Sequence, residues 1–244
     1  MKIFADLHLH SCLSPCGDGD MTPYNLVNMA ALLGYQLIAL TDHNTCRNTP
    51  AAVRAGEQAG LPVAPGMELT TAEDAHVVCL FPTVEDAFGF QEEVERRRVR
   101  VPNRPEIFGN QFIMDSEDHV LGEEPDLLIN ATSIGAGEAL ALARRFHGTA
   151  FPAHVDKDAY SLIASLGAIP PETGFAVAEL SHNAQLHRLL RSNPELGGMT
   201  LLRNSDAHYL ENMPDPSAWI ELEEPSAACL VETLNRPGKV TGAW

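Results

Sequence analysis

Histidine and acidic side chains recur in this chain directly after short apolar segments. Imidazole nitrogens and carboxylate oxygens are common ligands of zinc, manganese and iron, and a bound divalent ion activates water for attack on a substrate. The recurrence therefore predicts several divalent ions gathered in the site of a metal-dependent hydrolase. The side chains in this pattern are His8, His10, Asp42, His43, Glu68, His76, His154, Asp206 and His208.

The spacing of two pairs favours chelation. In an extended segment, residues i and i+2 point to the same side. His8 and His10 can therefore approach one ion, and Asp206 and His208 can approach two adjacent ions. One such pair alone is weak evidence, because a His-x-His inside a strand is often two solvated or core imidazoles. Several pairs at strand ends together indicate a metal site.

Short apolar runs alternate with longer segments of helical period, which indicates βα units and a parallel sheet that closes into a barrel. Such barrels carry their chemistry at the carboxyl ends of the strands, where most of the candidate ligands fall. His76 is the exception, since it precedes its apolar run. Helices are expected at 22–34, at 49–60 and after Ser226. Strands are expected near 2–7, 37–40, 63–64, 77–80, 150–152, 177–180, 201–203 and 218–222.

The segment 81–149 is too long for a single βα connection. It contains a charged helix and two short apolar runs around 116–118, which predict an inserted hairpin at about 82–130. The insertion could be a lid or specificity element at the site, or a passive surface excursion. No linker is visible, so we expect residues 1–244 to form one domain.

The acidic composition limits which partners the chain can bind. Its 244 residues carry 16 Lys and Arg against 33 Asp and Glu, a formal net charge of -17. Binding along a nucleic acid requires a basic surface, so we expect no extended nucleic-acid contact. A small anionic phosphoester stays compatible with this charge if the site itself is positive. The sequence leaves the oligomeric state open.

Cysteine usage and hydropathy indicate a cytoplasmic protein. Five scattered cysteines are typical of reduced thiols, so we predict no disulfide. Cys12 and Cys16 could form half of a zinc site, but no second pair follows at matching spacing. The chain opens without a secretion signal and has no run that could span a bilayer, so we expect no membrane association.

Several other polar residues are candidates for a functional role. Lys157 and Tyr160 follow His154, and His182 ends an expected strand, so Lys157 and His182 are possible substrate-binding residues. Asp42 could orient an imidazole. The cationic residues Arg96 to Arg104 are best explained as a solvated helix end, with a phosphate contact left open. Surface or capping roles explain the remaining histidines, His119, His147 and His187.

With these motifs the chain resembles the PHP (polymerase and histidinol phosphatase) superfamily of metal-dependent phosphoesterases. The resemblance implies a distorted seven-stranded (βα)7 TIM-like barrel with an inserted hairpin and helix segment. It also implies three divalent ions, of zinc, manganese or iron. The motifs that carry it are Asp6-Leu7-His8-Leu9-His10-Ser11, Thr41-Asp42-His43-Asn44, Gly66-Met67-Glu68, Pro152-Ala153-His154 and Ser205-Asp206-Ala207-His208.

The resemblance further implies which side chains hold each ion. His8, His10, Glu68 and Asp206 would hold the first, and Glu68 would bridge to a second held also by His76 and His154. Asp18, His43 and His208 would hold the third. At this last site the sequence departs from the family's short Ser-Asp-Gly, because Ser14-Pro15-Cys16-Gly17-Asp18-Gly19 interposes extra residues. Cys16 or Asp20 could take the place of Asp18.

The function implied is hydrolysis of a small-molecule phosphate ester by metal-activated hydroxide, with Glu68 and Asp206 as the catalytic residues. Two alternatives remain open. One is an amidohydrolase-like reaction on a non-phosphate substrate, because activated water also attacks carbonyl carbon. The other is a non-catalytic metal-bearing module of a nucleic-acid-processing complex.

Overall fold

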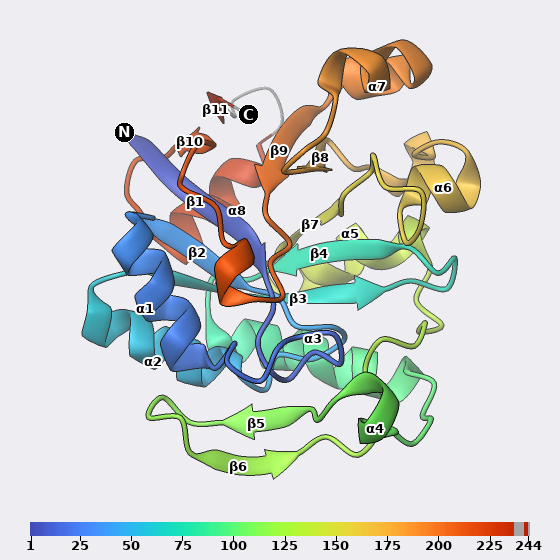
Figure 1. The fold of residues 1–244 in the computed structure, drawn as a ribbon. Helices are drawn as coiled ribbons and strands as arrows, with labels where there is room; N and C mark the ends of the chain where they lie inside the picture. The colour runs from blue at the N-terminus through green and yellow to red at the C-terminus, as the bar shows by residue number, and fades with distance from the viewer. Residues whose placement is uncertain (237–241, 244) are drawn as a thin grey trace.

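A curled seven-stranded sheet forms the centre of the chain in the computed structural model, which describes residues 1–236 and 242–243 (Figure 1). The strand order is β11-β10-β1-β2-β3-β4-β7. Each strand predicted from the sequence is present, and all but β3, which extends to Thr70, match within a few residues. The bounds are β1 (Lys2–Leu9), β2 (Leu37–Leu40), β3 (Val63–Thr70), β4 (His76–Leu80), β7 (Thr149–Pro152), β10 (Trp219–Glu221) and β11 (Gly242–Ala243).

The directions of the strands differ from the all-parallel barrel that the sequence suggested. Strands β1, β2 and β3 are parallel, but β4 runs antiparallel to both β3 and β7. The reason is local: β3 and β4 are joined by the short turn 71–75, and a connection this short permits only antiparallel pairing. Strands β8 (Val177–Ser181) and β9 (Thr200–Asn204) form a separate parallel pair. The expected seven-stranded (βα)7 barrel is therefore not confirmed, and the sheet is a curled half-barrel.

The pair β8 and β9 nevertheless packs against the main sheet, beside β7 and β1. A bridge joins Leu9 to Ala207, and the backbone N–H of Asp206 donates to the His8 carbonyl oxygen at 3.0 Å. The chain after β9 is thereby held against the carboxyl end of β1. Residues separated by almost 200 positions are brought together at this seam.

A change of register in β1 sets the direction of its last side chains. The pairing with β2 shifts by one residue between Asp6 and Leu9. Leu7 packs in the cluster between the sheet and α8 (Ala227–Leu234), whereas Leu9 packs against α1 (Pro23–Leu33) and α2 (Thr49–Ala59). An extra residue in a strand re-aims the side chains that follow it. The shift therefore turns His8 and His10 into the interior of the curled sheet.

Several of the helices pack against the sheet, whereas α7 (Leu186–Ser192) lies away from it at the edge of the molecule (Figure 1). The first begins where Thr22 Oγ1 accepts from the N–H of Asn25 at 3.1 Å and ends at Gly34 in the left-handed conformation, as the sequence predicted. The helices predicted at 49–60 and after Ser226 are also present. The α-helices are α1 (Pro23–Leu33), α2 (Thr49–Ala59), α3 (Val84–Arg97), α4 (Pro105–Phe108), α5 (Ala136–Arg145), α6 (Leu162–Leu166), α7 (Leu186–Ser192) and α8 (Ala227–Leu234), with 3-10 turns at Pro171–Thr173, Pro194–Gly198 and Leu210–Asn212.

The hairpin predicted between β4 and β7 is formed by β5 (Phe112–Met114) and β6 (Val120–Glu123), apart from the central sheet (Figure 1). Asn48 ties it to the start of α2, because its amide donates to the Phe112 carbonyl oxygen at 3.0 Å and accepts from the N–H of Met114 at 2.9 Å. All five cysteines are free, as predicted. Within the described ranges, none of the helices has the length and apolar character required to cross a bilayer.

Candidate metal centre

Eight of the nine predicted ligands, all except Asp18, meet at one edge of the curled sheet, and each lies at or just after an end of a strand. His8 and His10 come from the end of β1, and Glu68 lies near the end of β3. His76 begins β4, but because β4 is antiparallel, its start lies at the same edge as the ends of the parallel strands. The antiparallel turn thus explains the one candidate whose sequence position seemed irregular. The others follow strands β2, β7 and β9: His43, His154, Asp206 and His208.

Glu68 is the centre of the cluster. The side chain is buried, and each of its two oxygens faces different imidazoles. Oε2 lies 2.9 Å from His43 Nδ1 and 3.2 Å from His10 Nε2. Oε1 lies 2.9 Å from His76 Nδ1, 3.1 Å from His8 Nε2 and 3.2 Å from His154 Nε2. One carboxylate therefore contacts five histidines, as a bridging ligand requires.

Asp206 closes the cluster on the side of β1. Its Oδ1 lies 3.2 Å from His10 Nε2 and 3.4 Å from His8 Nε2. Its Oδ2 accepts from Lys157 Nζ at 2.5 Å. Potential ligand atoms of His8, His10, Glu68 and Asp206 all lie within 4.8 Å of one another, as do those of His43, Glu68 and His76.

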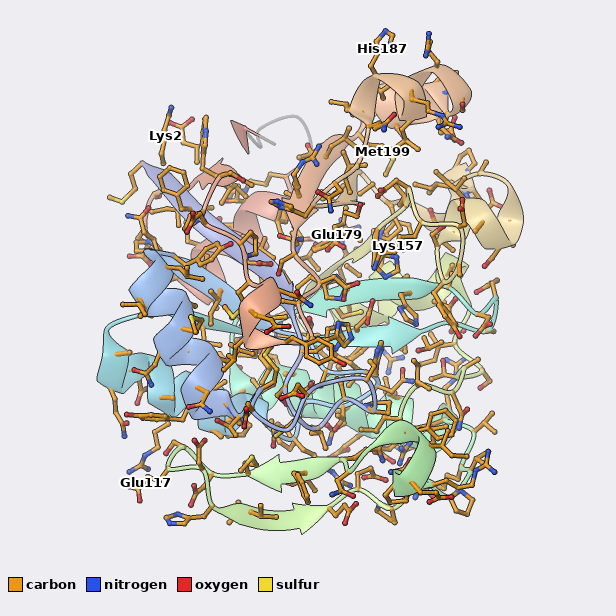
Figure 2. All side chains as sticks on the ribbon, in the orientation of Figure 1. Lys2, Glu117, Lys157, Glu179, His187 and Met199 are labelled. Atoms are coloured by element: carbon orange, nitrogen blue, oxygen red, sulfur yellow. The ribbon has the colours of Figure 1, made fainter. Side chains whose placement is uncertain are left out.

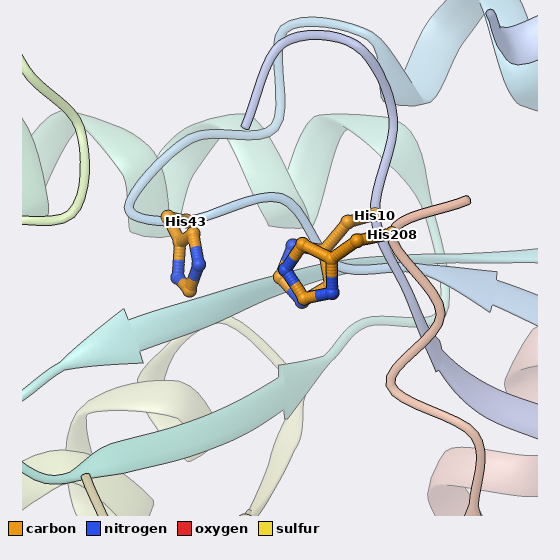
Figure 3. A group of neighbouring side chains, drawn as sticks. All are labelled: His10, His43 and His208. Atoms are coloured by element: carbon orange, nitrogen blue, oxygen red, sulfur yellow. The ribbon is translucent and has the colours of Figure 1, made fainter. Parts of the chain in front are cut away.

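A third group consists of His10, His43 and His208 (Figure 3). The rings of His10 and His208 stack with centroids 4.1 Å apart, and that of His43 lies 4.6 Å from His10. Figure 3 shows the overlapping pair beside the isolated His43 ring. Three imidazoles at these distances place several nitrogen lone pairs in one small volume.

The hydrogen bonding of the buried ligand atoms shows whether these histidine and acidic side chains could bind a cation. Several ligand atoms are buried and make no hydrogen bond of favourable angle within the described part of the chain, although imidazole nitrogens and carboxylate oxygens lie within 3.2 Å of one another. Leaving such atoms unpaired is costly, and a divalent ion would satisfy them together. The mixture of imidazole and carboxylate suits zinc, manganese and iron. The unpartnered atoms are His43 Nδ1, Glu68 Oε2, His76 Nε2, His154 Nδ1 and Asp206 Oδ1.

The electrostatics of the cluster separate its histidines into two kinds. Burial lowers the pKa of His43 to about 4 and that of His208 to about 3, which leaves both imidazoles neutral. Burial acts in the same direction on His10, but the contacts with Asp206 and Glu68 outweigh it and raise the pKa of His10 to about 9. The neighbouring histidines overcome the effect of burial and hold the pKa of Glu68 well below its usual range. The carboxylates are therefore ionised and attract cations.

Glu179 is a functional candidate that the sequence analysis did not select. Its side chain is fully buried at the floor of the site, on β8, and both of its oxygens lie 3.0 Å from His8 Nδ1. It also accepts from the backbone N–H of His154 at 3.0 Å and from the Asn204 amide at 2.8 Å. A carboxylate behind a ligating imidazole fixes its orientation and tautomer. An acidic residue inside the apolar run Ala178-Glu179-Leu180 was the available signal.

Asp42 orients an imidazole indirectly. Its carboxylate accepts from the Ser11 hydroxyl at 2.6 Å and from the Ser14 hydroxyl at 2.7 Å. The Ser14 oxygen in turn lies 2.9 Å from His10 Nδ1. The contact between Asp42 and the imidazole anticipated from the sequence is thus relayed by one serine hydroxyl.

The backbone at the site is strained. His154, Tyr160 and Asp206 have φ values of 29°, 55° and 54°, in the left-handed region that side chains with a Cβ rarely adopt. The Tyr160 ring stacks on His76, with centroids 5.0 Å apart. Strain of this kind persists where surrounding contacts hold it, and it gathers at functional sites.

A cavity of about 170 Å³ opens onto the cluster and is lined by His43, Glu68, His76, His154 and the residues around them. Lys157 also lines it. His182 does not, since it lies on the exposed turn after β8, beside Arg203. The Asp18 carboxylate also lies outside the three groups and accepts from the N–H of Asp20 at 2.9 Å. The sequence assignments of His182 and Asp18 therefore receive no support from their positions.

The remaining histidines and the arginine run lie elsewhere. His119 is exposed and lies 3.0 Å from Asp115, and His147 lies 2.8 Å from Asp86. His187 is at the outer edge of the molecule on α7 (Figure 2). Acidic partners within the chain, not the site, contact Arg96, Arg97, Arg98 and Arg100.

Comparison with known proteins gives matches to one family. The profile described as PHP domain matches residues 6–191. The 3',5'-nucleoside bisphosphate phosphatase of Chromobacterium violaceum is 36% identical over 73 residues, which are 30% of this chain and 25% of the relative. The 5'-3' exoribonuclease Rnm of Salmonella typhimurium is 32% identical over 108 residues, which are 40% of this chain and 35% of the relative.

A solved structure extends the likeness of fold to almost the whole chain. The lesion-specific endonuclease PfuEndoQ from Pyrococcus furiosus superposes with a TM-score of 0.70 at 18% identity, covering 99% of this chain and 57% of that one. At this identity the likeness concerns the fold alone. The matched segments span between 5% and 60% of the length of seven curated relatives.

Proposed function

The chain belongs to the PHP domain family, and from this premise we propose that it is a metal-dependent hydrolase of the phosphate ester of a small anionic molecule. The observation that carries the proposal is the convergence of buried, unpartnered nitrogen and oxygen atoms around Glu68. The names of two relatives describe action on nucleoside bisphosphates and on RNA. Cleavage of a phosphoester bond is the chemistry they share.

The proposed assignment of ligands follows the three groups of atoms. His8, His10, Glu68 and Asp206 would hold one ion, and Glu68 would share a second with His76 and His154. His43 and His208 would belong to a third. Divalent ions of zinc, manganese or iron would lower the pKa of water toward about 7 and offset the negative charge that develops on the phosphate oxygens.

The chain's own residues would position these groups and the substrate. Glu179 holds the His8 ring, and Ser14 links Asp42 to the His10 ring. The Lys157 ammonium reaches the cavity beside Asp206, where it would bind a phosphate oxygen of the substrate. Glu68 and Asp206 would act as the catalytic residues through their contact with the reacting centre. Water would be the nucleophile, so the chain need not supply one.

Charge and size support a small substrate over a polymer. Lys157 is the sole Lys or Arg among the residues that line the cavity in the described part of the chain. Binding along a nucleic acid requires a track of Lys and Arg. The run Arg96 to Arg100 offers no such track, because acidic residues of the chain neutralise it. The net charge of -17 opposes a polyanion further.

Phosphate release tests the proposal. The chain is stripped with a chelator, reloaded with Mn²⁺, Zn²⁺ or Fe²⁺, and assayed against sugar, nucleotide and amino-alcohol phosphates. We expect metal-dependent release from at least one small ester, lost in Glu68→Gln and kept in the exposed control His119→Ala. Labelled RNA and DNA oligonucleotides form a second arm of the assay.

Other outcomes would replace parts of the proposal. Cleavage of oligonucleotides alone would overturn the small substrate while retaining phosphoester chemistry. Turnover of amides or lactones alone would indicate the amidohydrolase-like alternative. Absence of turnover together with an obligatory complex with a polymerase would indicate a non-catalytic module.

A further inference from the structure

The thiol of Cys16 lies beside the third group of histidines. Its Sγ is 3.3 Å from His43 Nε2, and it lines the same cavity as His43 and His208. For comparison, zinc–sulfur and zinc–nitrogen bonds of about 2.3 and 2.0–2.1 Å in a tetrahedral site place the two ligand atoms about 3.5 Å apart. The observed separation is therefore close to that of two ligands of one ion.

The loop that carries Cys16 is held in place by backbone contacts. Cys12 donates to the Met21 carbonyl oxygen at 2.8 Å, and Gly17 donates to that of Ser14 at 2.9 Å. A Cβ on Gly17 would lie 2.3 Å from the Ser11 carbonyl oxygen, so the tight turn after Cys16 requires glycine. The position of the thiol is thus set by the fold of the loop.

The two acids that compete with Cys16 are directed elsewhere. The Asp18 backbone N–H donates to the His208 carbonyl oxygen at 2.9 Å, which fastens the loop to the site. Its carboxylate, however, closes a turn by accepting from the N–H of Asp20. Asp20 is exposed and does not line the cavity. Among residues 1–236 none of these three side chains belongs to a group whose ligand atoms all lie within 4.8 Å of one another, but of the three the Cys16 thiol alone contacts His43.

A second observation indicates that a ligand fills the cavity next to Cys16. His76 lines it with a side chain that is 5% exposed, and its buried Nε2 has no hydrogen-bond partner in the part of the chain described; Glu68 Oε2 and Asp206 Oδ1, on two other lining residues, make no hydrogen bond of favourable angle. The side chains of Glu68 and Asp206 are 1% and 10% exposed. The thiol therefore borders a space whose other walls carry buried nitrogen and oxygen atoms that could bind a cation.

We propose that Cys16 supplies a thiolate ligand to a divalent ion held also by His43 and His208. The inference rests on the metal-binding part of the proposed function. A coordinated thiol loses its proton to solvent, and the sulfur donates an electron pair to the ion, so no oxidant is required. Sulfur is a soft ligand that favours zinc or iron over magnesium or manganese. The third site would thus differ from the first two, which offer nitrogen and oxygen alone.

Cobalt spectroscopy tests the proposal without reference to activity. The full chain is stripped with a chelator and titrated with Co²⁺, and the near-ultraviolet thiolate-to-cobalt charge-transfer band is recorded together with the visible bands. We expect the charge-transfer band in the wild type, its loss in Cys16→Ser, and its retention in Cys229→Ser and Asp18→Asn. Bound cobalt should fall by about one ion per chain in Cys16→Ser, because the thiolate would be a ligand of a single ion.

X-ray absorption at the zinc edge of the wild-type chain adds a readout that needs no variant. A sulfur neighbour at about 2.3 Å is expected. Cobalt or zinc bound without a charge-transfer band and without a sulfur neighbour would overturn the role of Cys16 and leave the proposed metal cluster intact. Failure of the wild type to bind either ion would overturn both proposals.

Discussion

The ring nitrogens of histidines at the strand ends and those of histidines on the outer elements have different kinds of polar contact. Around Glu68 the rings are buried, close to carboxylates, and several of their nitrogens lack a partner in the described structure. On the outside, His119 and His147 are 69% and 78% exposed, and each meets one aspartate. Both groups contain histidines next to acidic residues, but only the buried group around Glu68 would be stabilised by bound cations. Burial without partners, more than the presence of histidine, distinguishes a metal site from a polar surface.

The largest loss of activity is expected for a substitution at Glu68. Glu68→Gln keeps the shape of the side chain but removes the charge that five imidazoles surround. We expect the rate of phosphate release to fall about a thousandfold, the scale seen when one charge-stabilising group is lost from an active site. Steady-state assays with saturating metal would measure this. A rate within threefold of the wild type would show that the cluster is not the site of reaction.

Glu179 should show an intermediate effect, because it acts on the site through His8. Glu179→Gln leaves the fully buried side chain in place but weakens its hold on the ring. Loss of such a carboxylate behind a ligand lowers metal affinity or activity by about 10- to 100-fold. Metal titration and rate measurements are compared with those of the exposed control Glu57→Gln. Equal affinity in both variants would exclude a positioning role.

A substitution at Arg98 tests the outer region of the molecule, where contacts between charged side chains stabilise the fold. Its side chain is fully buried and lies 3.1 Å from Glu124 and 3.2 Å from Glu95. Arg98→Met leaves these carboxylates without a buried cation, which should lower the free energy of unfolding by about 3 to 5 kcal/mol. Urea denaturation measures the change. Lost metal binding in chains that remain folded would instead connect Arg98 to the site.

The smallest effect is expected for His119 in the hairpin turn. His119→Ala removes an exposed contact with Asp115, and exposed pairs contribute little. Turnover, metal content and midpoint of thermal unfolding should match the wild type within error. A marked loss of turnover would mean that the hairpin approaches the substrate, as the lid interpretation of the insertion requires.

Local chemistry made much of this molecule predictable from its sequence. Thr22-Pro23 and Gly34 delimit α1, and apolar runs locate the strands, because caps and periodicity are local signals. The direction of β4 was not predictable in this way. An apolar run does not show whether a strand is parallel or antiparallel to its neighbour, and the turn 71–75 contains no residue pair typical of a β-hairpin, such as Asn-Gly. The closed barrel was therefore not confirmed, and the place of His76 was understood only from the structure.

The site was predictable to the extent that its residues follow strands. Glu179 escaped because it lies within an apolar run, where a buried carboxylate is recognised only by its contacts with His8, His154 and Asn204. Asp18 was selected by likeness to a family motif, but the direction of its side chain depends on the turn it makes with Asp20. Side-chain direction in an irregular loop is not encoded by spacing.

The number of divalent ions bound by each chain is the most direct measurement. Chelator-treated chain is equilibrated with Zn²⁺, passed through a desalting column and analysed for metal and protein. We expect about three ions per chain in the wild type, one for each group of ligand atoms, and at least one fewer in Glu68→Gln. A wild-type chain that retains no ion, or a Glu68→Gln chain that retains the same number, would contradict a metal cluster centred on Glu68.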